Sequence, residues 1–198
     1  MKFPSPVALP LRLAGWEFET PLPAEPKYVL LAVPHTSNWD GVLLLALAQR
    51  VGLKMSWMIK AEWVRGPLGA VLRRLGAVAI DRARAGDVVP QMIEELQRRD
   101  ELVLVIPPEG TRGRAEYWKS GFYRIALGAG VPVVPGYLDY KRKRAGVGPA
   151  IHLTGDVAAD MAKIRAYYAS SPAAALYPDK FGPIRLRDED APAAPDAG

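Results

Sequence analysis

The sequence lacks cysteine and long apolar runs, and each absence excludes a class of protein. With no cysteine among 198 residues, the chain can form neither a disulfide framework nor a thiolate metal site. The longest strictly apolar runs are about seven residues, whereas a helix that spans a bilayer needs ~20. Residues 1–15 also lack the uninterrupted apolar core of a signal peptide. We therefore expect a soluble or peripheral cytoplasmic protein.

The composition is that of one folded domain. Hydrophobic residues make up 49% of the chain and charged residues 24%, which is typical of a globular protein with a sizeable core. Residues 1–27 form a proline-rich segment, which we expect to pack on the core through Trp16 and Phe18. The main domain then spans residues 28–187. Residues 188–198 are acidic with alternating proline and alanine, and they predict a disordered tail.

Apolar strand-like runs alternate with helix-like stretches along the main domain. Strands are predicted at 28–33, 56–60, 77–80, 102–106, 131–140 and 150–154, and helices at 38–52, 67–75, 87–99, 119–129 and 157–169. This alternation predicts an α/β fold in a single domain. Because the strands are too apolar for either face of the sheet to be exposed to solvent, we expect helices on both faces of a central sheet. The basic stretch 141–144 and the following 145–148 predict a hairpin-like surface loop.

A histidine and an aspartate directly follow the first predicted strand. The hexad 35–40 reads H-T-S-N-W-D, with Asp40 about one helical turn after His35. Such a pair suits general-base chemistry, because the carboxylate can hold one ring nitrogen as N–H while the other accepts a proton. A structural, hydrogen-bonded His35 is the alternative, and the sequence offers no third ligand for a metal site. The other histidine, His152, is predicted to lie within a strand and to be structural.

Three further blocks accompany this H-x-x-x-x-D pattern. The strand 102–106 is followed by P-P-E-G-T-R at 107–112, Arg82 follows the short strand 77–80, and Pro135 ends the apolar block 131–135. Four blocks in this order resemble the glycerolipid acyltransferases, the lysophosphatidate acyltransferase family. The resemblance covers roughly residues 28–155. It implies a central mixed sheet, and it identifies 28–187 as an acyltransferase domain.

The resemblance also implies a reaction and a site. A fatty acyl group moves from acyl-CoA or acyl-carrier protein to a lysophospholipid hydroxyl, most directly that of 1-acylglycerol 3-phosphate, in phospholipid biosynthesis and without cofactor or metal. His35 is then the base and Asp40 its orienting group. The residues expected at the acceptor phosphate are Arg82, Glu109, Gly110, Thr111 and Arg112. Lys119 and Pro135 match further family positions where substrate binding is expected, although Lys119 suits a helix start equally well.

The residue types allow more than one route for the acyl group. The chain has no cysteine and no serine in a G-x-S-x-G elbow, which favours direct attack by the acceptor over an acyl-enzyme on Ser37. Arg112 offers a planar fork for a phosphate, and Gly110 lets the backbone approach a ligand closely. An ordinary surface ion pair is the alternative for Arg82 and Arg112.

Positive charge is concentrated in one window. Residues 50–84 contain eight basic and two acidic side chains, a net +6 against +5 for the whole chain, together with Trp57 and Trp63. Basic residues interleaved with tryptophan suit an anionic membrane surface, so we expect a peripheral protein on the inner face of the membrane. A solvated helix face over core aromatics is the alternative. Nucleic acid is not expected, because no recognised motif accompanies the charge.

Other functions remain open at this point. The same chemistry could serve another acceptor, such as a lyso-aminolipid or a glycolipid, or the thioester could simply be hydrolysed. A non-catalytic module that binds membranes or phosphate is a third possibility, and the intact His35 and Asp40 argue against it.

Overall fold

The computed structural model describes residues 8–19, 22–62, 66, 69–74, 76–80, 88–171, 173–187 and 189. Arg82, Trp63 and the predicted tail 188–198 apart from Glu189 lie outside these ranges.

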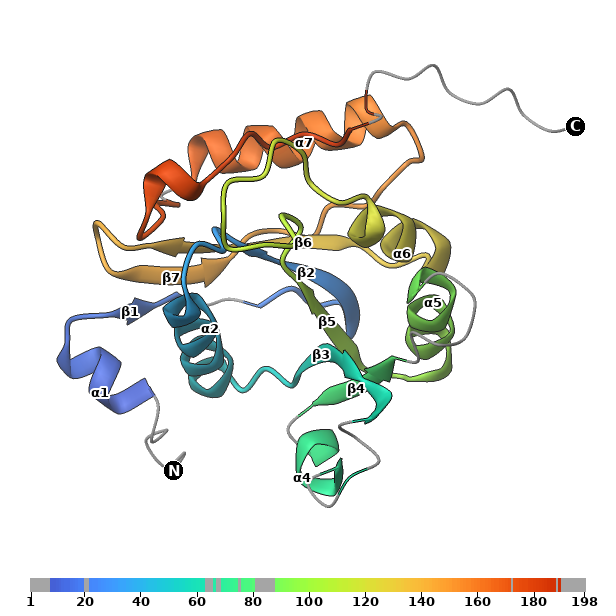
Figure 1. Ribbon diagram of the computed structural model, residues 1–198, viewed down its shortest axis with the longest axis horizontal. Coiled ribbons are helices and arrows are strands. Elements are labelled where there is room, and N and C mark those ends of the chain that lie inside the picture. Colours follow the sequence, from blue (N-terminus) through green and yellow to red (C-terminus); the bar gives the residue numbers. More distant parts are fainter. Residues whose placement is uncertain are drawn as a thin grey trace, which may run out of the picture.

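A seven-stranded mixed sheet forms the centre of the molecule (Figure 1). Its strands are β1 (Glu17–Phe18), β2 (Lys27–Val33), β3 (Met55–Lys60), β4 (Ala77–Ile80), β5 (Leu102–Ile106), β6 (Val133–Asp139) and β7 (Arg144–Val147). They lie in the order β1-β7-β6-β2-β5-β3-β4. Every neighbouring pair is parallel except β6 and β7, which are antiparallel. The predicted α/β fold with a central mixed sheet is confirmed.

Helices cover both faces of this sheet, as predicted, but unequally (Figure 1). The helices are α1 (Ala8–Leu13), α2 (Asn38–Val51), α4 (Gly69–Arg74), α5 (Val88–Arg98), α6 (Gly121–Ala129) and α7 (Val157–Ser170). One face packs against α5, α6 and α7, and the other packs against α2, with α1 beside it. Among the described residues, no helix has both the length and the apolar character needed to cross a bilayer.

The central strands are buried on both sides, because alternate residues of a strand point to opposite faces. In β2, Val29 and Leu31 join the core under α5, α6 and α7, while Tyr28 and Leu30 join the core on the α2 side. All five residues of β5 are buried in the same alternating way. Continuous apolar runs in the sequence therefore did indicate strands covered on both faces.

The sequence prediction was wrong in two places. Residues 150–154 form no strand beyond an isolated bridge from Ile151 to Val133. The predicted surface loop 141–148 instead contains β7, which pairs with β6 and places Gly146 opposite Tyr137. A Cβ on Gly146 would lie 2.8 Å from the Tyr137 ring, so this position needs a glycine, a residue that otherwise argues against a strand.

The amino-terminal region adds two elements that the sequence did not indicate. The short helix α1 ends near Trp16, and β1 pairs in parallel with β7. Trp16 is 9% exposed and lies in a core cluster with Leu43 and Leu47 of α2.

Candidate active site

Three parallel strands end at the same edge of the sheet and bring separate sequence blocks together there. His35 follows β2, Glu109 follows β5 and Tyr140 follows β6, and β2 pairs in parallel with both other strands. Residues beyond the carboxyl ends of parallel strands are where ligands bind in open α/β sheets. The H-x-x-x-x-D and P-E-G-T-R blocks meet directly, because the His35 N–H donates to Glu109 Oε2 at 3.0 Å.

Asp40 is fixed by the way α2 begins. Ser37 is the N-cap, and its Oγ accepts the Trp39 N–H at 3.1 Å while Asp40 Oδ2 accepts the Ser37 N–H at 2.7 Å, a capping box. The same Oδ2 accepts the Thr36 N–H at 2.6 Å, and Oδ1 accepts the Tyr140 hydroxyl at 2.6 Å. With three donors around a carboxylate that is 3% exposed, the orientation of Asp40 is set before any substrate binds.

His35 faces this carboxylate without a direct hydrogen bond. His35 Nδ1 lies 3.8 Å from Asp40 Oδ2, and the histidine side chain remains 26% exposed. Burial lowers the pKa of His35, and the nearby Arg112 guanidinium lowers it further, against the opposing effect of Asp40. The ring is therefore neutral at pH 7, the state in which a histidine can accept a proton.

Glu109 is buried, with one oxygen satisfied and one not. Oε2 accepts the His35 N–H, whereas Oε1 has no hydrogen-bond partner among the residues that the structure describes, and Glu109 is 4% exposed. Burial raises the pKa of Glu109 to about 7, with Asp40 adding to the rise and the His35 N–H opposing it. In this structure Glu109 supports the backbone of the histidine loop, which is a different contact from the predicted one with an acceptor phosphate.

The remaining P-E-G-T-R residues form an exposed turn beside the histidine. Gly110 has φ +66°, and a Cβ there would lie 2.6 Å from Cε of Lys119, so the lysine side chain crosses over this glycine. Thr111 is exposed, and its Oγ1 accepts the Gly113 N–H at 3.2 Å. Arg112 is exposed and donates to Asn38 Oδ1 at the start of α2. This contact holds the guanidinium next to the loop that carries His35.

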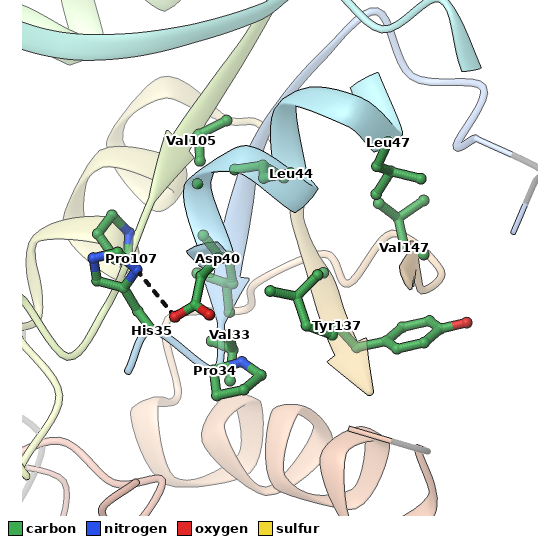
Figure 2. Close-up of a pocket in the computed structure, with 16 residues that line it drawn as sticks. Val33, Pro34, His35, Asp40, Leu44, Leu47, Val105, Pro107, Tyr137 and Val147 are labelled. Carbon is green, nitrogen blue, oxygen red and sulfur yellow. Dashed lines mark ion pairs between the residues drawn. The ribbon is translucent and has the colours of Figure 1, made fainter. Parts of the chain in front are cut away.

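An apolar pocket of about 120 Å³ opens beside His35 and Asp40, between α2 and the sheet (Figure 2). Figure 2 shows Leu44 and Leu47 of α2 on one side, with Tyr137 of β6 and Val147 of β7 across from them. Small residues line it as well, among them Ala32, Gly41, Gly136 and Gly146. The pocket therefore offers an apolar chain a place next to the imidazole.

Tyr140 and Asn38 belong to the site although the sequence analysis did not single them out. The Tyr140 ring packs edge-on against Trp16 at 5.2 Å between centroids, which ties the amino-terminal region to Asp40. The available signal for Tyr140 was its place at the carboxyl end of a predicted strand. Asn38 carried no signal, because only the fold brings it to Arg112.

The other predicted residues lie apart from this pair or outside the described chain. Arg82 is outside the described residues. Pro135 is buried within β6, and its neighbour Gly136, not Pro135, lines the pocket. His152 is 73% exposed with Nε2 3.7 Å from Glu25, and its predicted strand does not form. Within the described ranges, no three His, Cys, Asp or Glu side chains are grouped so as to hold a metal ion.

Comparison with known proteins finds similarity to a protein family and to a solved structure. The model of a family described as acyltransferase matches residues 17–139. A crystal structure of the 1-acyl-sn-glycerophosphate (LPA) acyltransferase PlsC from Thermotoga maritima is similar to 66% of this chain, with a TM-score of 0.49 and 22% sequence identity. The chain covers 57% of that protein's length. No curated protein sequence matches this chain.

Proposed function

Because the chain belongs to the acyltransferase family, we propose that it transfers a fatty acyl group from acyl-CoA or acyl-carrier protein to the hydroxyl of a lysophospholipid, with 1-acylglycerol 3-phosphate as the acceptor. The observation that carries this proposal is the His35–Asp40 pair, 3.8 Å apart, at the mouth of an apolar pocket. A base beside an apolar pocket suits a reaction between a hydroxyl and a fatty thioester.

In the proposed mechanism His35 moves one proton. Asp40 faces Nδ1, so Nε2 takes the proton of the acceptor hydroxyl as its oxygen attacks the thioester carbonyl. The tetrahedral intermediate then collapses, the carbon–sulfur bond breaks, and the imidazolium returns the proton to the departing thiolate. The lowered pKa of His35 supports this role, because the ring is neutral before the reaction. Asp40 stabilises the imidazolium while it exists.

The amino-terminal end of α2 supports stabilisation of the intermediate's oxyanion. Helix amino termini carry partial positive charge, and this one lies at the pocket mouth, where Gly41 and Asp40 line the wall. The capping box uses the Trp39 and Asp40 N–H groups, and the Asn38 N–H takes no part in it. Arg112, bonded to Asn38, adds a full positive charge at the same end.

For the acceptor phosphate, the proposal uses the exposed turn that carries Thr111 and Arg112. An arginine can bind phosphate with two parallel hydrogen bonds, and Lys119 over Gly110 adds a second cation on that side. Arg82 joins the proposed site by resemblance to the family. The acyl chain takes the apolar pocket, where His35 and Asp40 are the only acidic or basic side chains on the wall among the described residues.

A product assay tests the proposal. Purified protein is incubated with palmitoyl-CoA or palmitoyl-acyl-carrier protein and a panel of lysophospholipids, lyso-aminolipids and glycolipids, and products are read by mass spectrometry. We expect a new ester, highest with 1-acylglycerol 3-phosphate, that requires His35. Free fatty acid alone would identify a thioester hydrolase, an ester on another acceptor would reassign the substrate, and no turnover with any pair would reject catalysis.

A further inference from the structure

Helix α2 has apolar side chains on both of its faces. Leu43 and Leu47 are buried in the core at 2% exposure each, yet Trp39, Val42 and Leu45, which follow one another at three-residue spacing, are 60%, 36% and 38% exposed. An apolar stripe that remains exposed on a helix with another face already buried is a candidate contact for a partner. Within the described part of the chain, no element covers this outer stripe of α2.

Helix α1, which adjoins α2, carries further exposed apolar side chains. It packs against α2 (Figure 1) and inserts Leu11 into the core beside Trp16, while Leu9 and Leu13 remain 43% and 82% exposed. The five exposed apolar side chains on these adjoining helices are Leu9, Leu13, Trp39, Val42 and Leu45, which we call the α1–α2 ridge. Several exposed apolar side chains on two adjoining helices are candidates for an interaction site.

The charges on these two helices have one sign. Arg12 and Arg50 are exposed, and the only acidic residue on either helix, Asp40, is buried. The outer face of α5 is different, since Glu94, Gln97 and Arg98 are its exposed residues after Pro90. A surface that combines apolar groups and tryptophan with positive charge is complementary to an anionic lipid interface.

The pocket lies under the same helix. Gly41 and Leu44 of α2 line its wall, so the ridge and the pocket are two sides of one element. At about 120 Å³ the pocket is smaller than the roughly 300–1,000 Å³ typical of sites that enclose a whole ligand. A long acyl chain would therefore leave most of its length outside the pocket, where an apolar medium must receive it.

From these observations we propose that the α1–α2 ridge docks the protein on the interface of an anionic lipid bilayer, with α2 lying between the lipid and the catalytic pocket. The proposal rests on the proposed function only in that the acceptor is an amphiphile held in that bilayer. It differs from the sequence-based expectation, which put the membrane contact in residues 50–84. There Met55 is buried, Met58 packs against the core and Trp57 is half-buried, which leaves Val71 as the exposed large apolar side chain among the described residues of that window.

The absence of cysteine makes a direct test possible. A single cysteine at Leu13→Cys is labelled with an environment-sensitive fluorophore, and phosphatidylglycerol–phosphatidylcholine vesicles are added without substrate. We expect a blue shift of the Leu13 probe. The matched control, Leu127→Cys on α6, begins from an apolar side chain that is 41% exposed and should not shift. An unshifted Leu13 probe on protein that still co-sediments with the vesicles overturns the proposal.

A pair of double variants measures the contribution of the ridge. Leu9→Gln with Leu13→Gln should weaken co-sedimentation with these vesicles by at least about tenfold, because each buried leucine contributes on that order. Val71→Gln with Leu127→Gln makes the same chemical change elsewhere and should weaken it less than about twofold by the usual size of surface effects. Equal losses in the two double variants would overturn the proposal.

The same variants separate docking from catalysis. Leu9→Gln with Leu13→Gln should keep turnover of soluble short-chain thioester and acceptor while losing turnover of acceptor in vesicles. If no ester forms from any substrate but the Leu13 probe still shifts, the proposed function fails and docking stands. If light scattering shows that the ridge instead joins two copies of the chain, and vesicles bind neither form, docking is overturned.

Discussion

Two helices of this protein begin with nearly the same device, a buried aspartate that gathers donors from the preceding loop and from a tyrosine. At α2, Asp40 accepts the Thr36 and Ser37 N–H groups and the Tyr140 hydroxyl. At α7, Asp160 accepts the Thr154 and Gly155 N–H groups and the Tyr123 hydroxyl at 2.9 Å. Both carboxylates are almost fully buried, at 3% and 0% exposure.

The two sites differ in the further groups that surround each carboxylate. Asp160 receives two more donors, Thr154 Oγ1 at 3.0 Å and Lys163 Nζ at 3.1 Å, and this set of contacts lowers its pKa although burial alone would raise it. Asp40 instead faces an imidazole at 3.8 Å beside an open pocket. Similar local structure thus serves stability at Asp160, where donors surround the carboxylate, and in the proposed mechanism it serves the reaction at Asp40, where one direction is left to His35.

Removal of the imidazole should give the largest effect. His35→Ala should lower kcat/KM by roughly two to four orders of magnitude, the usual contribution of a positioned base, with little change in thermal stability because His35 is partly exposed. His152→Ala, which removes the other histidine of the chain, is the control and should leave both quantities unchanged. Single-turnover acylation at the wild-type rate in folded His35→Ala protein would exclude the mechanism.

Replacement of Asp160, whose carboxylate is surrounded by donors, should lower stability and leave activity nearly unchanged. Asp160→Ala leaves the buried Tyr123 hydroxyl without its acceptor, at about 1–3 kcal/mol for an unsatisfied buried group, and it also removes the acceptor of the part-buried Thr154 and Gly155 N–H groups. We expect the free energy of unfolding in denaturant to fall by about 3–5 kcal/mol. The kcat/KM of the folded fraction should stay within about twofold of wild type. A large loss of kcat/KM at unchanged stability would mean that Asp160 serves activity and not stability, against the contrast drawn with Asp40.

The sequence could indicate that His35 and Asp40 lie close together, because both residues lie within one hexad next to a strand. The apolar runs likewise predicted β2, β4 and β5 well, since buried parallel strands are continuous apolar segments. The meeting of Glu109 with His35 was not predictable in detail, because it depends on the β2–β5 pairing 74 residues apart. The edge strand β1 and its neighbour β7 were missed for the same reason, since their pairing is a tertiary contact and β7 contains a glycine.

Tyr140 and Tyr123 show this limit most clearly. Both are aromatic residues in apolar surroundings, and nothing local indicates that their hydroxyl groups reach aspartates 100 and 37 residues away. Periodicity reports burial, whereas the partner of a buried hydroxyl is decided by the packing of elements that are distant in sequence.

Glu109 should make the stability of the folded protein depend on pH in a range where Asp160, whose pKa is lowered, should not. Its pKa in the folded protein, about 7, lies above the ordinary value of 4.5, so the folded state holds this proton where the unfolded state has lost it. Stability must therefore fall as pH rises from 4.5 to about 7, by about 3 kcal/mol for this group. Glu109→Gln keeps an acceptor for the His35 N–H but has no charge to bury. We expect the variant to gain stability relative to wild type across this window in denaturant titrations at pH 4.5, 6 and 8. A constant difference between the two proteins at all three pH values would contradict the burial of a titrating Glu109.

Tyr140→Phe should give the smallest effect, in the activity and not in the fold. The variant keeps the ring contact with Trp16 and removes the hydrogen bond to Asp40. A hydrogen bond to a charged group contributes about 1.5–3 kcal/mol, and water that enters from the pocket should replace part of this contribution. We expect kcat to fall by about threefold to tenfold, which corresponds to roughly 1 kcal/mol. Without the tyrosine donor the Asp40 charge acts more strongly on His35, and because that charge raises the pKa of His35, the acid limb of the pH–rate profile should move to higher pH. Tyr123→Phe removes the matching bond to Asp160 and should lower stability by a comparable free energy with no movement of that limb. If both variants move the acid limb equally, or neither does, Tyr140 only supports the fold and Asp40 is no more a functional group than Asp160.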